Sequence, residues 1–241
     1  IFYAAPGAGK SLTLQTMAIE VALGGAGLWQ AVTRAPVLYV NLERSAVSLE
    51  RRHRMLTAAL GHASAPVTYI HARGYGLKAV ETRVRRFVRD NDHSVLMLDS
   101  LSRAQTGGSL IEDTTANRFT DLMNSLGTTW AAIGHVRRGD DSHVYGSIHQ
   151  DAGADIMVQV TSQKKDAVLG VQLRITKAND IGNAPADYLA FEFNEGGVVG
   201  VRGARSSEFP ELMIGEKISR SDKVDLYLSE HDVGNAEDIA A

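Results

Sequence analysis

The sequence predicts an α/β fold in which helices flank a mostly parallel β-sheet, with an antiparallel extension toward the C-terminal end. Short apolar runs alternate with amphipathic helical segments over residues 1–134. From residue 155 onward, apolar runs follow one another without helices between them. The chain has 241 residues, of which 44% are hydrophobic and 22% charged, so it can bury one sizeable core.

The first part of the chain alternates strands and helices. Residues 1–4 are apolar and strand-like, and residues 10–23 have helical periodicity that ends at consecutive glycines. Residues 37–40 predict a buried strand and residues 45–60 a helix, with Ser45 or Ser48 as its N-cap. The pattern repeats with a strand at 67–71 and a helix at 77–90. Such alternation implies parallel strands joined by right-handed crossovers.

The later part of the chain changes character. A strand at residues 95–98 is followed by a helix over about 113–126 and a strand at 130–134. The strands of the predicted antiparallel extension are residues 156–161, 168–176, 188–193 and 198–202.

The chain divides into three predicted parts. We assign residues 1–205 to the core domain and residues 206–221 to a linker, because periodic apolar positions are few in that linker. Residues 222–241 predict the start of a truncated helical module, for which a winged helix is one interpretation. The chain is strand-like from its first residue and lacks an initiator Met, so we expect it to be a fragment.

Composition excludes several classes of protein. The 25 Lys and Arg against 28 Asp and Glu give a net charge of −3, which argues against a surface broadly built for polyanions. The absence of cysteine excludes a disulfide framework and a cysteine zinc site. No run approaches the roughly 18 apolar residues that cross a bilayer, and the start does not resemble a signal peptide. We therefore expect a cytoplasmic protein without a membrane partner.

A phosphate-binding loop is the strongest motif. It lies between a predicted strand and a predicted helix, where backbone N–H groups and the positive end of the helix can bind a phosphate. Lys10 is expected to reach the β- and γ-phosphates of ATP, and Ser11 to bind Mg²⁺. The first glycine of the pattern is replaced by Ala4, which matters if that position needs positive φ. The predicted nucleotide-binding residues are Ala5, Pro6, Gly7, Ala8, Gly9, Lys10, Ser11 and Leu12. The alternative is an ordinary glycine-rich turn before a helix.

Three polar residues follow other predicted strands. Asp99 ends the apolar run of residues 95–98, a Walker B pattern that supplies a carboxylate for Mg²⁺ near Lys10. Glu43 ends another strand and is placed to orient and deprotonate the attacking water. His135 ends the strand predicted at residues 130–134 and is placed to sense the γ-phosphate. The alternatives are an acidic residue that starts a loop, a salt-bridged helix start and a loop histidine, respectively.

The order of these motifs resembles the RecA-like ATPases, most closely the RepA-like hexameric replicative helicases and related AAA-family ATPases of plasmids and phages. The resemblance covers roughly residues 1–202. The phosphate-binding loop, residues 37–43, residues 96–103 and residues 133–135 carry it in combination, whereas residues 146–147 and 173–177 are weaker.

The resemblance implies roles for individual residues. Glu43 is the implied catalytic base, Asp99 the holder of the magnesium shell, and His135 the link from the γ-phosphate to mobile loops. In a ring or filament, Lys177 is the implied catalytic contact to a neighbouring subunit's nucleotide, unless it is only an exposed charge at a strand end. An arginine that stabilises the transition state usually follows two residues later, but that position is Asn179 here. Arg174 or another arginine then replaces it, or hydrolysis is slow.

The resemblance also implies two DNA-facing loops, residues 103–111 and 136–151. Their Arg103, Arg137 and Arg138 are the candidate contacts to the phosphates of single-stranded DNA. The second loop also contains acidic residues, so solvated surface loops without nucleic acid are the alternative.

These observations predict Mg²⁺-dependent ATP hydrolysis by an oligomeric, hexamer-type motor acting on DNA, of the replicative helicase type. ATP is favoured over GTP because no guanine-specific Asn/Thr-Lys-x-Asp motif is present. The alternative is an ATP-dependent regulatory switch, or a recombinase loader, that acts through protein partners.

Overall fold

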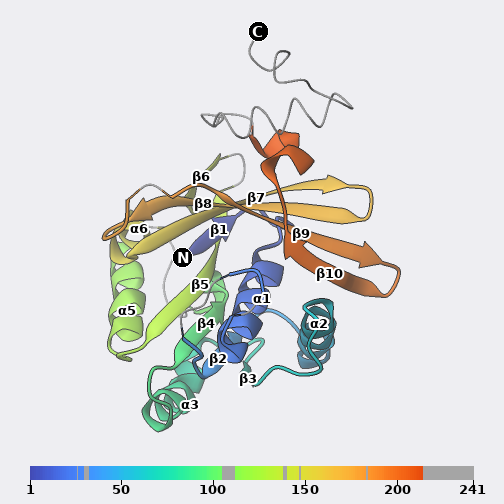
Figure 1. The fold of residues 1–241 in the computed structure, drawn as a ribbon. Helices are drawn as coiled ribbons and strands as arrows, with labels where there is room; N and C mark the ends of the chain where they lie inside the picture. Colours follow the sequence, from blue (N-terminus) through green and yellow to red (C-terminus); the bar gives the residue numbers. More distant parts are fainter. Residues whose placement is uncertain are drawn as a thin grey trace, which may run out of the picture.

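The structure is a computed structural model that describes residues 1–213, except residues 26, 30–32, 105–111, 138–139, 147 and 183. Within this part, ten strands form one sheet in the order β10-β9-β8-β7-β1-β5-β4-β2-β3, and β6 pairs with β5 (Figure 1). The parallel strands are β1 (Phe2–Ala4), β2 (Val37–Asn41), β3 (Val67–His71), β4 (Val95–Asp99) and β5 (Thr129–Arg137), and β7 (Ile156–Lys165) continues them beside β1. The antiparallel strands are β8 (Val168–Ala178), β9 (Asp187–Asn194), β10 (Gly197–Gly203) and β6 (Asp140–Val144). The predicted fold class is confirmed.

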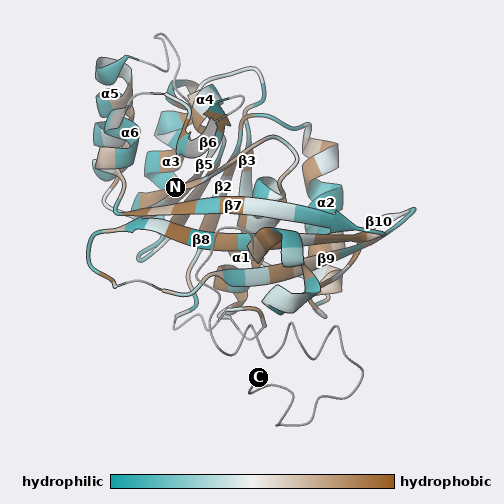
Figure 2. Cartoon of the chain, turned by 90° about the horizontal axis from the view of Figure 1, so that it is seen from above, coloured by the Kyte–Doolittle hydropathy of each residue, from teal (hydrophilic) through white to brown (hydrophobic). Residues whose placement is uncertain are grey.

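Helices cover both faces of the sheet because its central strands are apolar on both sides. In β2, Val37 and Tyr39 join the core beneath α1 (Lys10–Leu23) and α2 (Ala46–Ala59). Leu38 and Val40 join the opposite core with α3 (Leu77–Asp90), α4 (Leu101–Ala104) and α5 (Asp113–Asn124). Each fully buried side chain of this size contributes roughly 1.5–3 kcal/mol. In Figure 2, α2 and α5 carry both brown apolar and teal polar residues, as helices with one buried face do.

The helices and strands start close to the predicted positions. Ser45 is the N-cap of α2, where its hydroxyl accepts a hydrogen bond from the Ser48 backbone N–H at 3.3 Å. Gly24 ends α1 with φ of 93°, the left-handed geometry that glycine adopts at helix ends.

The region after residue 134 differs from the prediction. His135 does not end its strand: β5 continues to Arg137 and then pairs with β6 in an antiparallel hairpin. A short helix, α6 (Ile148–Gly153), follows. The predicted second DNA-facing loop, residues 136–151, is therefore largely regular structure. Alternating hydrophobicity is weak there, so the residue pattern does not predict a strand.

The first residues of the predicted linker pack against the core. Two 3-10 helices, Ser206–Glu208 and Pro210–Met213, bury Phe209 and Leu212 against Ala190 of β9. Residues 214–221 and the predicted helical module at 222–241 lie outside the described residues. In the described part of the chain, none of the helices combines the length and the apolar character that crossing a bilayer requires.

Candidate nucleotide-binding site

The predicted site residues meet at the carboxyl ends of the parallel strands. Lys10, Glu43, Asp99 and His135 line one cavity of ≈ 290 Å³, together with Ser11 and residues of the phosphate-binding loop. Asp99 ends β4, Glu43 follows β2 and Lys10 follows β1 across the loop, whereas His135 lies inside β5 near its carboxyl end. Parallel strands place these ends at one edge of the sheet. Residues far apart in the sequence therefore lie close together around this cavity.

The loop between β1 and α1 has the backbone that its glycines predict. Gly7 has φ of 86° and Gly9, the N-cap of α1, has φ of 87°, both in the left-handed region. Ala4 is the last residue of β1 and pairs with His135, so alanine is unstrained there. Ala4 therefore does not need the positive φ that would favour glycine at this position of the pattern.

Lys10 lies across its own loop. Its side chain is 5% exposed, and its Nζ donates hydrogen bonds of 2.8 Å to the backbone oxygens of Ala4 and Ala5. Burial lowers the pKa of Lys10 to about 8, although the carboxylates of Asp99 and Glu43 act in the opposite direction. The ammonium group is thus held at the cavity, where a phosphate can replace the two carbonyl partners.

The residues around Asp99 fit a divalent cation. Asp99 is 1% exposed; its Oδ2 accepts a 3.1 Å hydrogen bond from Tyr39, while Oδ1 is buried without a partner in the described part of the chain. Burial and the nearby Glu43 raise the pKa of Asp99, and the hydroxyls of Ser11 and Tyr39 lower it. Asp99 thus keeps one buried carboxylate oxygen without a hydrogen-bond partner in the described residues, and the Ser11 hydroxyl lies near the same carboxylate. Oxygen atoms of this kind are the ligands that Mg²⁺ prefers.

Glu43 is held as an ionised carboxylate. Its Oε1 lies 3.6 Å from Nε2 of His135 and accepts a hydrogen bond from the Ser100 hydroxyl. Hydrogen bonding by His135, together with the Ser100 hydroxyl and the charge of Arg103, lowers the pKa of Glu43 to about 2 against the effect of burial. A carboxylate with so low a pKa is a weak proton acceptor, so in this state it is better suited to orient a water than to deprotonate it.

Lys177 lies away from this cavity. Its Nζ donates to the backbone oxygens of Asp151, Ala152 and Ala154 at 2.7, 3.1 and 2.7 Å, and thereby caps the C-terminal end of α6. At the expected position of the finger arginine, Asn179 donates a 3.0 Å hydrogen bond to Asp155 of its own chain. The implied contact of Lys177 with a neighbouring subunit stays a prediction.

The candidate DNA contacts are partly described. Arg103 is exposed on α4, and Arg137 is exposed at the end of β5. Arg138 and residues 105–111 lie outside the described residues. A role of these arginines in DNA binding is still a prediction.

Sequence reasoning missed several residues of the cavity. Arg44 and Arg52 also line it, Tyr39 binds Asp99, and Ser100 binds Glu43. One signal for Arg52 was available, because it lies in the stripe formed by residues 49, 52, 53 and 56 of an amphipathic helix. Burying a charged residue in such a stripe is costly unless the charge is paired or hydrogen-bonded, so its presence there indicates a ligand or a partner.

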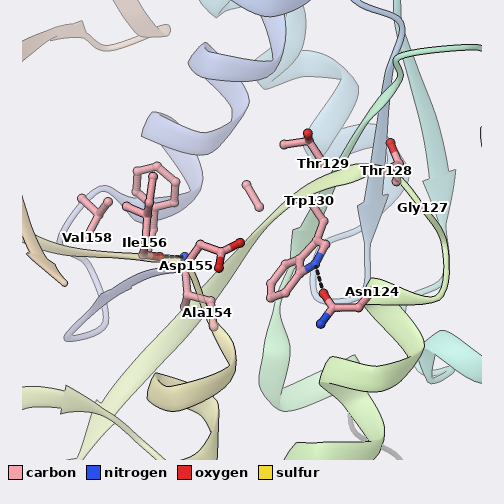
Figure 3. Close-up of a pocket in the computed structure, with 12 residues that line it drawn as sticks. Asn124, Gly127, Thr128, Thr129, Trp130, Ala154, Asp155, Ile156 and Val158 are labelled. Carbon is pink, nitrogen blue, oxygen red and sulfur yellow. Dashed lines mark hydrogen bonds between the residues drawn. The ribbon is translucent and has the colours of Figure 1, made fainter. Parts of the chain in front are cut away.

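A larger cavity lies at the opposite edge of the sheet. It measures ≈ 610 Å³ and is lined by Phe2 and other residues where β1, β5 and β7 begin. Figure 3 shows Thr129 of β5 and Ile156 of β7 among them. Asp155 is the one charged side chain among its lining residues, and Trp130 donates a 3.2 Å hydrogen bond to Asn124 beside it. None of its described lining residues is a lysine or an arginine, which are the side chains that bind phosphate groups, so its size does not make it the nucleotide site.

Comparisons with known proteins agree with this geometry. A family model described as an AAA domain matches residues 1–141. No curated protein matches the chain. Among solved structures, the chain is similar to the flagellar accessory protein FlaH from Methanocaldococcus jannaschii, with 16% sequence identity and a TM-score of 0.56. The match covers 84% of this chain and 87% of FlaH, and it shows a shared fold.

Proposed function

Since the chain belongs to the AAA domain family of P-loop ATPases, we propose that it hydrolyses ATP with Mg²⁺ as an oligomeric, RecA-like motor on DNA, of the replicative helicase type. The observation that carries ATP hydrolysis is the meeting of Lys10, Ser11, Glu43 and Asp99 at one cavity. Phosphoryl transfer needs these groups together: a cation for the phosphates, oxygen ligands for the metal and a carboxylate for the water.

The loop and Lys10 bind the triphosphate. Backbone N–H groups at the start of α1 face the phosphates, and the helix dipole adds positive potential. On ATP binding, Lys10 exchanges its hydrogen bonds to the backbone oxygens of Ala4 and Ala5 for bonds to phosphate oxygens, whose negative charge stabilises the ammonium group. The same charge then balances the negative charge that grows on the γ-phosphate oxygens during transfer.

Ser11 and Asp99 are the proposed holders of Mg²⁺, and Tyr39 fixes the carboxylate of Asp99 from behind. The metal ion, when bound, neutralises charge on the β- and γ-phosphates. Glu43 orients the attacking water. Release of Glu43 by Ser100 and His135 on ATP binding would raise its pKa and make it a better base.

Action on DNA in an oligomer is the finer part of the proposal. The exposed Arg103 follows β4, at the edge of the sheet that carries the cavity, and Arg137 ends β5 at the same edge. A phosphate backbone held there lies close to the site whose occupancy changes during hydrolysis.

A regulatory switch or recombinase loader that acts on protein partners is the second candidate. One observation favours it: Lys177 and Asn179 both bind groups of their own chain, so the residues expected to reach a neighbour's nucleotide are already engaged. A switch does not need the fast hydrolysis that such contacts support in motors.

Phosphate release measured with and without single-stranded DNA tests both parts. We expect Lys10→Ala to abolish ATP turnover, and hydrolysis at the wild-type rate by this variant would refute the assigned site. Stimulation by single-stranded DNA that is lost on mutating Arg103 and Arg137 at low salt supports the motor, whereas unchanged rates favour the switch.

A further inference from the structure

We propose that Arg52 is a catalytic residue that contacts the γ-phosphate of ATP bound in its own subunit and stabilises the transition state, in place of an arginine from a neighbour. The inference rests on the proposed ATP hydrolysis and adds a residue to that site. It explains how this chain can hydrolyse ATP with asparagine at the expected finger position.

The location of Arg52 in α2 is unusual for an arginine. Leu49 and Leu56, three residues before and four after it, are fully buried in the core beneath the sheet. The spacing places Arg52 on the same face of the helix as these leucines. The side chain is half-buried and reaches the nucleotide cavity beside Glu43 and Asp99.

The guanidinium group of Arg52 is incompletely satisfied. Its Nη1 is buried and makes no hydrogen bond within the part of the chain that the structure describes. Arg52 also forms no ion pair with the described carboxylates, although Asp99 lies close enough to raise its pKa against the stronger lowering effect of burial. Burying an unpaired donor is unfavourable, so binding of an anionic acceptor in the cavity would stabilise this side chain.

Other arginines are placed less favourably. Arg174 is exposed on β8 and donates a hydrogen bond to Gln159 of the neighbouring strand. Arg44 lines the cavity but is exposed, and Arg51, which precedes Arg52, donates to the backbone oxygen of Gly196 at 2.8 Å. Arg52 combines a position at the cavity with an unused buried donor, which is why we assign the role to it.

The chemical step needs such a donor. The oxygen of water forms a bond to the γ-phosphorus, the bond from that phosphorus to the β–γ bridging oxygen breaks, and ADP and inorganic phosphate result, with the water proton passing to Glu43 or to the phosphate. Negative charge grows on the γ-phosphate oxygens and the bridging oxygen as the bonds change. The forked donors of Arg52 can bind two such oxygens together, which a lysine ammonium group does less well.

The test compares Arg52→Ala with the matched variant Arg51→Ala on the full chain. We expect kcat to fall at least about 10³-fold for Arg52→Ala, as for other transition-state arginines, and to change less than about twofold for Arg51→Ala. Affinity for the transition-state mimic MgADP–fluoroaluminate should fall with kcat, while MgADP affinity stays near wild type. Circular dichroism and urea unfolding verify that both variants fold.

The outcomes separate this inference from the proposed function. A wild-type chain without ATPase activity refutes the proposed function itself. If the wild type is active, an unchanged kcat in Arg52→Ala overturns the role of Arg52, and so does an equal loss of affinity for MgADP and for the mimic, since that indicates a structural effect.

A mixing experiment tests action within one subunit. Lys10→Ala subunits keep Arg52 but cannot turn over ATP. If adding them to Arg52→Ala restores hydrolysis, the arginine acts on a neighbour's nucleotide and the inference is wrong. If activity stays low while the two variants are shown to co-assemble, or while both remain monomeric, action within one subunit is supported.

Discussion

Substituting Gly9→Ala should damage both the fold and the nucleotide site, for two separable reasons. Gly9 has φ of 87°, and a Cβ atom added there would lie 2.9 Å from Cγ2 of Val171 and 3.4 Å from Cδ2 of Leu169. Val171 is fully buried on β8 and, being β-branched, has little freedom to turn away.

The two effects can be estimated independently. An alanine in the left-handed region costs roughly 1–2 kcal/mol in the backbone alone. Forcing a methyl group into a packed core adds about 1–3 kcal/mol. The control is Gly61→Ala, because Gly61 has φ of 82° and no atom within 4 Å of an added Cβ, so it reports the backbone effect only.

Urea unfolding of Gly9→Ala, Gly61→Ala, Val171→Ala and the Gly9→Ala/Val171→Ala pair measures both contributions. We expect Gly9→Ala to lose about 2–5 kcal/mol, clearly more than Gly61→Ala, and Val171→Ala to recover about 1–3 kcal/mol of it as coupling energy in the double-mutant cycle. Equal losses for Gly9→Ala and Gly61→Ala, or a coupling energy near zero, would show that contact with β8 does not constrain the loop.

Three further predictions concern charged groups. Because the pKa of Lys10 is about 8, ATP affinity should fall by up to about tenfold per pH unit above pH 8 in the wild type but not in Lys10→Met, as measured by titration with a fluorescent ATP analogue. The pKa of Glu43 is lowered from 4.5 to about 2, so the ionised carboxylate contributes its full stabilisation above pH 4.5 and loses it as the pH falls toward 2. The difference in free energy of unfolding between wild type and Glu43→Gln, measured by urea unfolding, should shrink over that pH range by no more than about 3 kcal/mol. Lys177→Met should speed amide exchange in residues 148–153 without weakening ATP binding, and unchanged exchange there would contradict its role as the cap of α6.

Sequence was a good guide where a residue's role follows from its position along one element. The glycine-rich loop, Asp99 at the end of β4 and Glu43 after β2 were found because apolar strands are easy to recognise and their carboxyl ends converge. The strands of the C-terminal extension were also predicted, unlike β6, although β7 and β8 extend four and two residues further than their predicted apolar runs. Their exposed ends are paired by backbone hydrogen bonds, for which side-chain pattern gives no sign.

Residues whose role depends on tertiary contacts were harder to find. Tyr39 lies in an apolar run that predicts only a buried strand. Its hydroxyl meets Asp99 because β4 pairs with β2 in the sheet. Lys177 was interpreted through the resemblance, but in this chain its partners are the carbonyl groups of α6, which the sequence does not pair with it. Arg52 required knowing which side of α2 faces the cavity.

The position of β1 has a consequence for how the protein is made. This strand of three residues pairs with Ile133 of β5 on one side and with Val158 of β7 on the other. A nascent chain on the ribosome therefore exposes its phosphate-binding loop long before the strands that fix it exist. We expect newly synthesised chains to acquire nucleotide affinity only after residue 158 has left the exit tunnel, as is usual for structures that depend on contacts distant in sequence.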